Sequence, residues 1–210
     1  MNRDNLSRFT HGPLAGMLAW AMAVLFFASL FGFGALLDGY SQIHHPVSLL
    51  GATGVPRALA FNLLAFVLPG LVAALLAVEL RARLPAGAGW WSRLGTQMLL
   101  LSALGLAAMG LLPLDPQDLE SEASRLHGTA WMGWVIAFVL GSAAISIGLG
   151  RKRLAVRLAW VSGAASLALP LAAFLLPELV GAGVAQRLAF AVWFGWFAYA
   201  ARRTSLAARP

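Results

Sequence analysis

The stretch PLAGMLAWAMAVLFFASLFGFGALL, residues 13–37, decides the fold of this chain. It contains no charged residue and is longer than the roughly 20 apolar residues that a helix needs to cross a bilayer. Arg3 and Arg8 precede it, as basic residues precede a secretory signal, but the apolar run is too long for a signal and has no convincing small-residue cleavage site. The stretch is therefore predicted to be a retained first transmembrane helix.

Five further segments are long and apolar enough for the same role. They cover residues 56–80, 92–112, 127–150, 154–176 and 187–201, and the last could begin earlier, near Gly181. The whole chain is 60% hydrophobic and 11% charged, whereas a soluble domain is about half apolar and about a quarter charged. The runs lack the period-two alternation of an outer-membrane barrel, and no composition break marks a second domain. The sequence predicts an all-α transmembrane bundle of six helices, a single domain over residues 1–210.

The basic residues predict the orientation of this bundle. Of the 15 lysines and arginines, only Arg57, Arg125 and Arg187 fall at one set of helix ends. By the positive-inside rule the other set, which includes both termini, lies in the cytoplasm of a multi-pass inner-membrane protein. This bias explains the net charge of +7, and no nucleic-acid partner is expected. The inner set is Arg3, Arg8, Arg81, Arg83, Arg93, Arg151, Lys152, Arg153, Arg157, Arg202, Arg203 and Arg209.

Polar side chains gather at the outer end of the predicted bundle. Because ionisable groups at membrane depth are costly and usually mark function, a site that opens to the periplasm is expected there. Cysteines are absent, which excludes thiolate chemistry, and the spans offer no facing histidines for a haem. No cofactor is predicted. The outer set is Tyr40, Ser41, His44, His45 and Ser48 in the first outer loop, Asn62 in the second span, Asp115 in the second outer loop, and His127 and Arg187 at the starts of the fourth and sixth spans.

Several of these residues fall in motifs that resemble a known family. HPVSLLG follows the first span, FN lies early in the second, LPLD follows the third and LHG opens the fourth. With the last segment GAGVAQRLAFAVWFGWFAYAARR, they resemble the bacterial membrane family catalogued as domain of unknown function 998. That resemblance implies six spans and no known chemistry. A remoter resemblance, carried by Pro46, Ser48, Gly51, Asn62 and His127, is to the eukaryotic DRAM and Frag-type membrane proteins, and it implies a link to lipid organisation or lipid-anchor remodelling.

Two chemical interpretations of the outer residues remain open. In a hydrolase or transferase acting on a lipid, His127 would be the base, Asp115 its orienting partner and Ser48 the nucleophile, with His44 as a further catalytic candidate. No nucleophile elbow or oxyanion signature accompanies them. In a metal site, His44, His45, Asp115 and His127 would give zinc a nitrogen and oxygen shell. Adjacent histidines, however, rarely both point inward, so zinc is an alternative rather than a predicted cofactor.

Two further interpretations need no reaction. In the first, a lipid headgroup or other small molecule is bound, with Tyr40, His45, Arg57, Asn62 and Arg187 positioning it, since a guanidinium suits phosphate or carboxylate. In the second, the protein is a scaffold or a transporter whose outer loops bind a partner, and the polar groups only satisfy one another. The leading hypothesis is recognition, with or without modification, of a lipid or lipid-linked molecule in the outer leaflet.

Two detailed expectations concern which side chains face inward. Pro46 biases His45 towards an extended backbone, so the two neighbouring imidazoles should point in opposite directions, with His44 facing the bundle. The aromatic series from Trp193 to Tyr199 covers all faces of the last helix and is expected to anchor that helix in lipid. The oligomeric state is not predicted.

Overall fold

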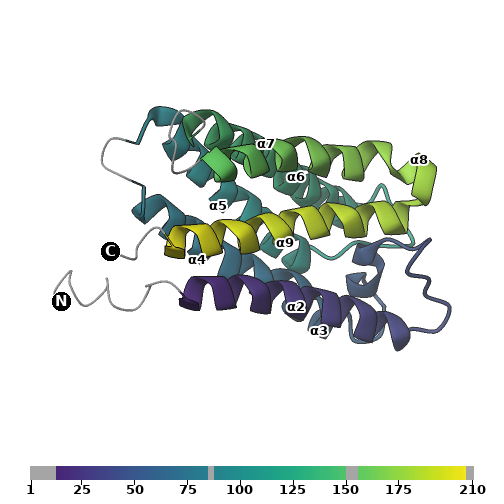
Figure 1. Cartoon of the computed structure of the whole chain (residues 1–210). Helices are drawn as coiled ribbons and strands as arrows, with labels where there is room; N and C mark the ends of the chain where they lie inside the picture. Colours follow the sequence, from purple (N-terminus) through teal and green to yellow (C-terminus); the bar gives the residue numbers. More distant parts are fainter. Residues whose placement is uncertain (1–12, 85–87, 150–155, 207–210) are drawn as a thin grey trace.

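The chain folds into an elongated bundle of helices that lie along a common axis (Figure 1). The computed structural model describes residues 13–84, 88–149 and 156–206, and these ranges contain no strand. The long helices are α2 (Pro13–Ala35), α4 (Leu68–Ala82), α5 (Trp90–Leu111), α6 (Glu122–Leu149), α7 (Val156–Pro170) and α9 (Ala182–Leu206). The shorter elements are η1 (Val47–Gly51), α3 (Ala58–Phe61), η2 (Asn62–Val67), η4 (Leu171–Leu175) and α8 (Pro177–Val180).

Five helical segments of the described chain are long and apolar enough to cross a membrane. They match the first five predicted spans, although the fourth begins at Glu122, before the expected residue 127. The predicted sixth span is the central part of α9, which is longer than expected and begins at Ala182, near the earlier start considered for it. A multi-pass membrane protein with an all-helical fold is thus confirmed, and the assignment of α9 as a sixth span stays a prediction. The segments are Leu14–Ala35, Ala58–Ala82, Trp90–Leu111, Glu122–Leu149 and Val156–Leu175.

The helices pack mainly against neighbours in sequence, and α9 closes the bundle by lying against α2 and α7. The first residue of α2 and the last residue of α9 lie at the same end of the bundle (Figure 1). Helices α5 and α6 approach closely: a Cβ on Gly141 would lie 3.0 Å from the Gly95 carbonyl oxygen, and a Cβ on Gly95 would lie 2.9 Å from the Gly141 carbonyl oxygen. Small residues allow such backbone contact between membrane helices, where van der Waals packing replaces the hydrophobic effect.

The two prolines inside predicted spans accompany local widening of the helix. Pro69 follows the π-helix η2, and Pro170 precedes the π-helix η4, in which Leu176 N–H donates to the Leu171 carbonyl oxygen at 3.0 Å. Proline has no N–H, and its ring collides with the carbonyl four residues earlier. The π-helix η2 contains Ala65, four residues before Pro69, so its wider turn relieves the collision there. Each of these two prolines thus lies directly beside, or one residue away from, a π-helical segment.

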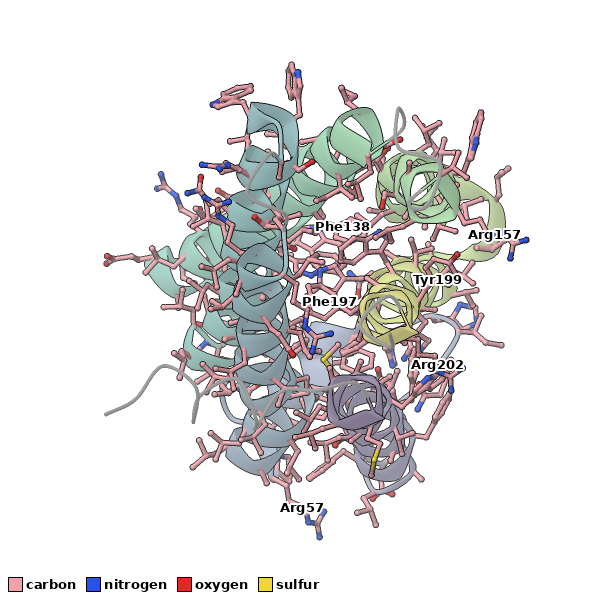
Figure 2. The ribbon with its side chains drawn as sticks, turned by 60° about the vertical axis from the view of Figure 1, so that its left-hand side comes forward. Arg57, Phe138, Arg157, Phe197, Tyr199 and Arg202 are labelled. Atoms are coloured by element: carbon pink, nitrogen blue, oxygen red, sulfur yellow. The ribbon has the colours of Figure 1, made fainter. Side chains whose placement is uncertain are left out.

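The aromatic series of α9 forms the core of the bundle and not a lipid anchor. Trp193, Phe194, Trp196 and Phe197 are each at most 3% exposed, and the labelled Phe138 and Phe197 lie inside the ring of helices in Figure 2. The expected anchoring role is wrong for these four residues because α9 has neighbours on opposite sides, α2 and α7. A helix that is apolar on all sides is typically buried.

Two serines pair with the indole groups of Trp193 and Trp196 in this core. Trp193 Nε1–H donates to Ser102 Oγ at 2.9 Å, and Ser102 Oγ–H donates to the Trp134 carbonyl oxygen at 2.9 Å. Trp196 Nε1–H donates to Ser162 Oγ at 3.0 Å. An unpaired polar group in hydrocarbon costs several kcal/mol, so these pairs let bulky amphipathic rings fill the centre of a membrane protein.

Candidate functional site

The loop between α2 and α3 is the predicted first outer loop, and it keeps that name below. It folds back into the end of the bundle. Within its motif HPVSLLG the last five residues form the short helix η1, in which Val47 and Leu50 are at most 2% exposed. Val47 N–H donates to Oε1 of Gln186 on α9 at 3.0 Å. The loop thus brings Ser48, which is half-buried, to the start of the last helix.

The Asn62 side chain hydrogen-bonds to the last residue of η1. Asn62 is 5% exposed, and its Nδ2–H donates to the Gly51 carbonyl oxygen at 2.9 Å. A Cβ at position 51 would collide with the Asn62 Oδ1 atom and come within 2.7 Å of its Cγ. Glycine at 51 and asparagine at 62 therefore act as a pair, and Asn62 has its amide directed at the loop.

Arg187 fixes the same loop from the side. Its Nε–H and one Nη2–H donate to Gln42 Oε1 at 3.0 and 2.7 Å, and the other Nη2–H donates to the Tyr40 hydroxyl at 2.7 Å. The Nη1 hydrogens go to the carbonyl oxygens of His45 at 3.1 Å and Gly183 at 2.6 Å. Since a guanidinium has five N–H donors, all of them are engaged within the chain, and Arg187 acts as a clamp between the loop and α9.

Tyr40 completes this clamp. Its hydroxyl donates to the Pro46 carbonyl oxygen at 3.2 Å while it accepts from Arg187. Burial raises the pKa of the Tyr40 phenol, although the Arg187 charge and hydrogen bond oppose that shift. The phenol therefore keeps its proton, which the bond to Pro46 requires.

The neighbouring histidines differ in burial, in the reverse order to the expected one. His44 is exposed, whereas His45 is half-buried and lies 5.6 Å from the Tyr40 ring between centroids. Ser41 N–H donates to His45 Nδ1, and His45 N–H donates to the Ser41 carbonyl oxygen, both at 3.0 Å. This reciprocal pair closes the turn and directs His45 inward, so the expectation that His44 faces the bundle is wrong.

The second outer loop is organised around Ser124. Its hydroxyl donates towards the Asp118 and Asp115 carbonyl oxygens, at 2.8 and 3.0 Å, and its Oγ accepts from the Asp115 N–H at 3.2 Å. The Asp115 carboxylate accepts from the Gln117 N–H at 3.0 Å in an Asx turn. Thr53 N–H donates to the Leu114 carbonyl oxygen at 2.8 Å, which ties the two outer loops together.

His127 lies one turn into the buried face of α6 and is 8% exposed. Its Nδ1 lies 2.8 Å from the Leu112 carbonyl oxygen. A carbonyl can only accept, so Nδ1 carries a proton, and in the neutral imidazole Nε2 keeps its lone pair. The orienting partner of His127 is thus a backbone carbonyl in the LPLD segment, and the structure does not join the ring to the Asp115 carboxylate.

Ser48 and His127 line a common pocket of about 180 Å³ at this end of the bundle. Its polar side chains come from η1, α6 and α9, and its apolar wall consists of three aromatic residues and Met109. Within the described part of the chain, neither the Ser48 hydroxyl nor the side-chain NH₂ of Gln186 has a hydrogen-bond partner. Both groups are free to bind a molecule in the pocket. We call this the outer pocket, and it is lined by Ser48, Phe66, Met109, His127, Gly128, Trp131, Gln186 and Phe190.

Residues 21–203 match the model of a family described as protein of unknown function (DUF998). The chain belongs to this family. No curated protein and no solved structure matched it, and the comparisons give no support for the resemblance to DRAM and Frag-type proteins. In this DUF998 protein the motifs that carried the family resemblance are those that build the outer end: HPVSLLG forms η1, FN supplies Asn62, LPLD supplies the Leu112 and Leu114 carbonyls, and LHG supplies His127.

The DUF998 protein brings only part of the predicted residue set together. Ser48 and His127 share the outer pocket, whereas Tyr40, His45 and Arg187 form the clamp beside it. His44 is exposed outside the pocket, and Figure 2 shows Arg57 projecting away from the bundle. The possible zinc ligands are not gathered, because the described ranges contain no group of three or more histidines and carboxylates. The catalytic and binding roles proposed for these residues stay predictions.

Two glutamines of the site are not singled out by the sequence. Gln42 supplies the carbonyl that Arg187 holds, and Gln186 both accepts from Val47 and lines the outer pocket. Both lie in stretches that attract attention for other reasons, next to the histidine pair and next to Arg187. A glutamine beside a charged residue at a helix start is an ordinary surface pattern, so only the fold shows that both side chains turn inward.

Proposed function

We propose that this protein resides in the inner membrane with both termini cytoplasmic, and that it binds a lipid or lipid-linked molecule from the outer leaflet. The polar headgroup would enter the outer pocket. The observation that carries the proposal is the convergence of Ser48, His127 and Gln186 from three separate elements onto one pocket, with donors left unused by the chain. Buried or half-buried polar groups are normally paired within the protein, so unused ones that face a pocket favour a ligand.

The size of the outer pocket limits what it can hold. Pockets for whole drug-sized ligands run from about 300 to 1,000 Å³, and a cavity of about 150 Å³ accommodates benzene. A pocket of about 180 Å³ therefore fits one small polar group and not an entire lipid. Phe66, Trp131 and Phe190 line the pocket beside the polar groups, and they would contact the apolar part of the molecule next to its headgroup.

Native mass spectrometry of protein purified from its own membranes tests this proposal. We expect a co-purified adduct on the wild type that is lost or strongly reduced in His127→Ala and Gln186→Ala. His44→Ala is the matched control, because it removes an imidazole from the same end of the molecule outside the outer pocket. An adduct that survives both pocket substitutions, or a wild type with no adduct, would refute the proposal and favour a scaffold whose outer loops bind a partner.

The shared position of Ser48 and His127 supports a second candidate function, hydrolysis or transfer of an acyl group on the bound molecule. With the proton of the neutral ring on Nδ1, His127 Nε2 has the lone pair that a general base needs to activate a serine hydroxyl. A fluorophosphonate probe tests this function directly. Labelling of the wild type that is lost in both Ser48→Ala and His127→Gln would support acyl transfer. An unlabelled wild type would refute acyl transfer, and ligand binding would remain as the proposed function.

A further inference from the structure

A groove of about 440 Å³ runs along the outside of the bundle between α2 and α9. Trp20, Phe27 and Phe31 of α2 form one wall, and Ala191, Gly195 and Ala198 of α9 form the opposite side. It is separate from the outer pocket, because the two share no lining residue. Its α2 wall belongs to a candidate membrane span, so in a bilayer the groove faces the hydrocarbon.

The groove has room for an occupant from outside the chain. A Cβ built on Gly195 meets no atom within 4 Å, and Trp20 and Phe31 are 46% and 55% exposed. From Trp20 to Phe31 the helix rises about 16 Å, at 1.5 Å per residue. A long, narrow and apolar groove in hydrocarbon suits a single acyl chain.

A cation marks one end of this groove. The Arg202 guanidinium lies 5.1 Å from the centroid of the Trp20 ring, and Arg202 is exposed. The Cγ of Arg202 lies 3.5 Å from the position of a Cβ on Gly16, so the side chain reaches across to α2. Figure 2 shows Arg202 beside α2 and α9. This end is the arginine-rich end of the bundle, where the headgroups of the predicted cytoplasmic leaflet lie.

We propose that the groove between α2 and α9 binds an anionic phospholipid, with one acyl chain in the groove and the phosphate of the headgroup at Arg202. Charge complementarity favours this occupant, since a basic residue near the membrane surface attracts anionic lipid. A second copy of the chain could use the small residues of α9, and the experiment below separates that occupant from a lipid. The phospholipid accounts for both the groove and the cation.

Native mass spectrometry with added lipid tests the proposal. Wild-type protein is titrated with phosphatidylglycerol and with phosphatidylcholine of the same acyl chains. We expect phosphatidylglycerol to bind about fivefold more tightly, as one arginine near an anionic headgroup predicts. Arg202→Gln should reduce that preference to about one, while Gly195→Leu should fill the groove and weaken both lipids.

Controls separate the groove from general effects of substitution. Gly133→Leu adds the same side chain at an exposed α6 position where a Cβ also meets no atom within 4 Å, and it should leave lipid binding unchanged. Ala191→Leu narrows the groove at a second exposed position, so a folding defect in one variant does not remove the test. Equal affinities of the wild type for both lipids would overturn the proposal. Lipid binding at the wild-type level by both the Gly195→Leu and Ala191→Leu variants would also overturn the proposal. The groove would instead be a dimer interface if the wild type is a dimer and both substitutions dissociate it without weakening lipid binding.

Discussion

Gly51 and Asn62 should be strongly coupled in folding. Asn62→Ala leaves the Gly51 carbonyl without its buried partner, which costs about 1–3 kcal/mol. Gly51→Ala forces the Asn62 amide out of its position, because the new Cβ and Oδ1 cannot occupy the same space. It therefore loses the same 2.9 Å hydrogen bond and adds overpacking strain, for a total of about 2–6 kcal/mol. In the double variant the methyl group added at position 51 fills part of the space that the amide vacated.

The double variant should therefore be less destabilised than the sum of the two single variants by about 1.5 kcal/mol or more. The assay is reversible unfolding in mixed micelles with increasing dodecyl sulfate, followed by tryptophan fluorescence. Gly133→Ala is the control, because a Cβ there meets open space and replacing a helical glycine by alanine should stabilise by up to about 1 kcal/mol. Single-variant effects that add within about 0.5 kcal/mol would refute the steric pairing of these residues.

Three further predictions concern the clamp and the topology. Arg187→Met should destabilise the protein by about 2–4 kcal/mol, because it removes several charge-assisted hydrogen bonds at a half-buried site. Amide hydrogen exchange in the first outer loop should then be faster than in the wild type, and an unchanged exchange rate would contradict the role of Arg187 as a clamp. Because burial raises the folded pKa of Tyr40 above its ordinary value of 10.0, its stabilising contribution should be complete below pH 10 and decline as the pH rises through the folded pKa. Ultraviolet titration in a Tyr199→Phe background should show the Tyr40 phenol ionising at a pH above the ordinary tyrosine value. Tyr40→Phe should abolish the decline in stability at high pH. A reporter fused after Pro210 should behave as cytoplasmic. A periplasmic signal would mean that the outer pocket opens to the cytoplasm and would refute the proposed orientation.

The spans could be predicted from the sequence because bilayer thickness sets the length of an apolar helix. Ser48 and His127 could be named for a related reason, since polar residues are rare in such a chain and a rare polar residue at a helix start attracts attention. The burial of the aromatic series of α9 is harder to predict, because the sequence does not show which helix becomes central. Its apolar character on every face is the available signal for burial.

The inner arrangement of the site could not be predicted, because it depends on contacts between distant segments. Which of His44 and His45 faces inward is decided by the turn that His45 closes with Ser41. The partner of His127 is a main-chain carbonyl, and no residue type signals that role in a sequence. Gln186 could have been found only by knowing that η1 lies on the start of α9.

The clamp between Arg187 and the first outer loop has a consequence for biogenesis. Gln42 and Arg187 are separated by 145 residues along the chain. At about 5–20 residues per second, the ribosome needs roughly 7–30 s to make the second residue after the first. The early spans can enter the membrane long before the loop acquires its final shape. A nascent chain arrested before α9 would then be membrane-inserted while the first outer loop still lacks its hydrogen bonds to Arg187.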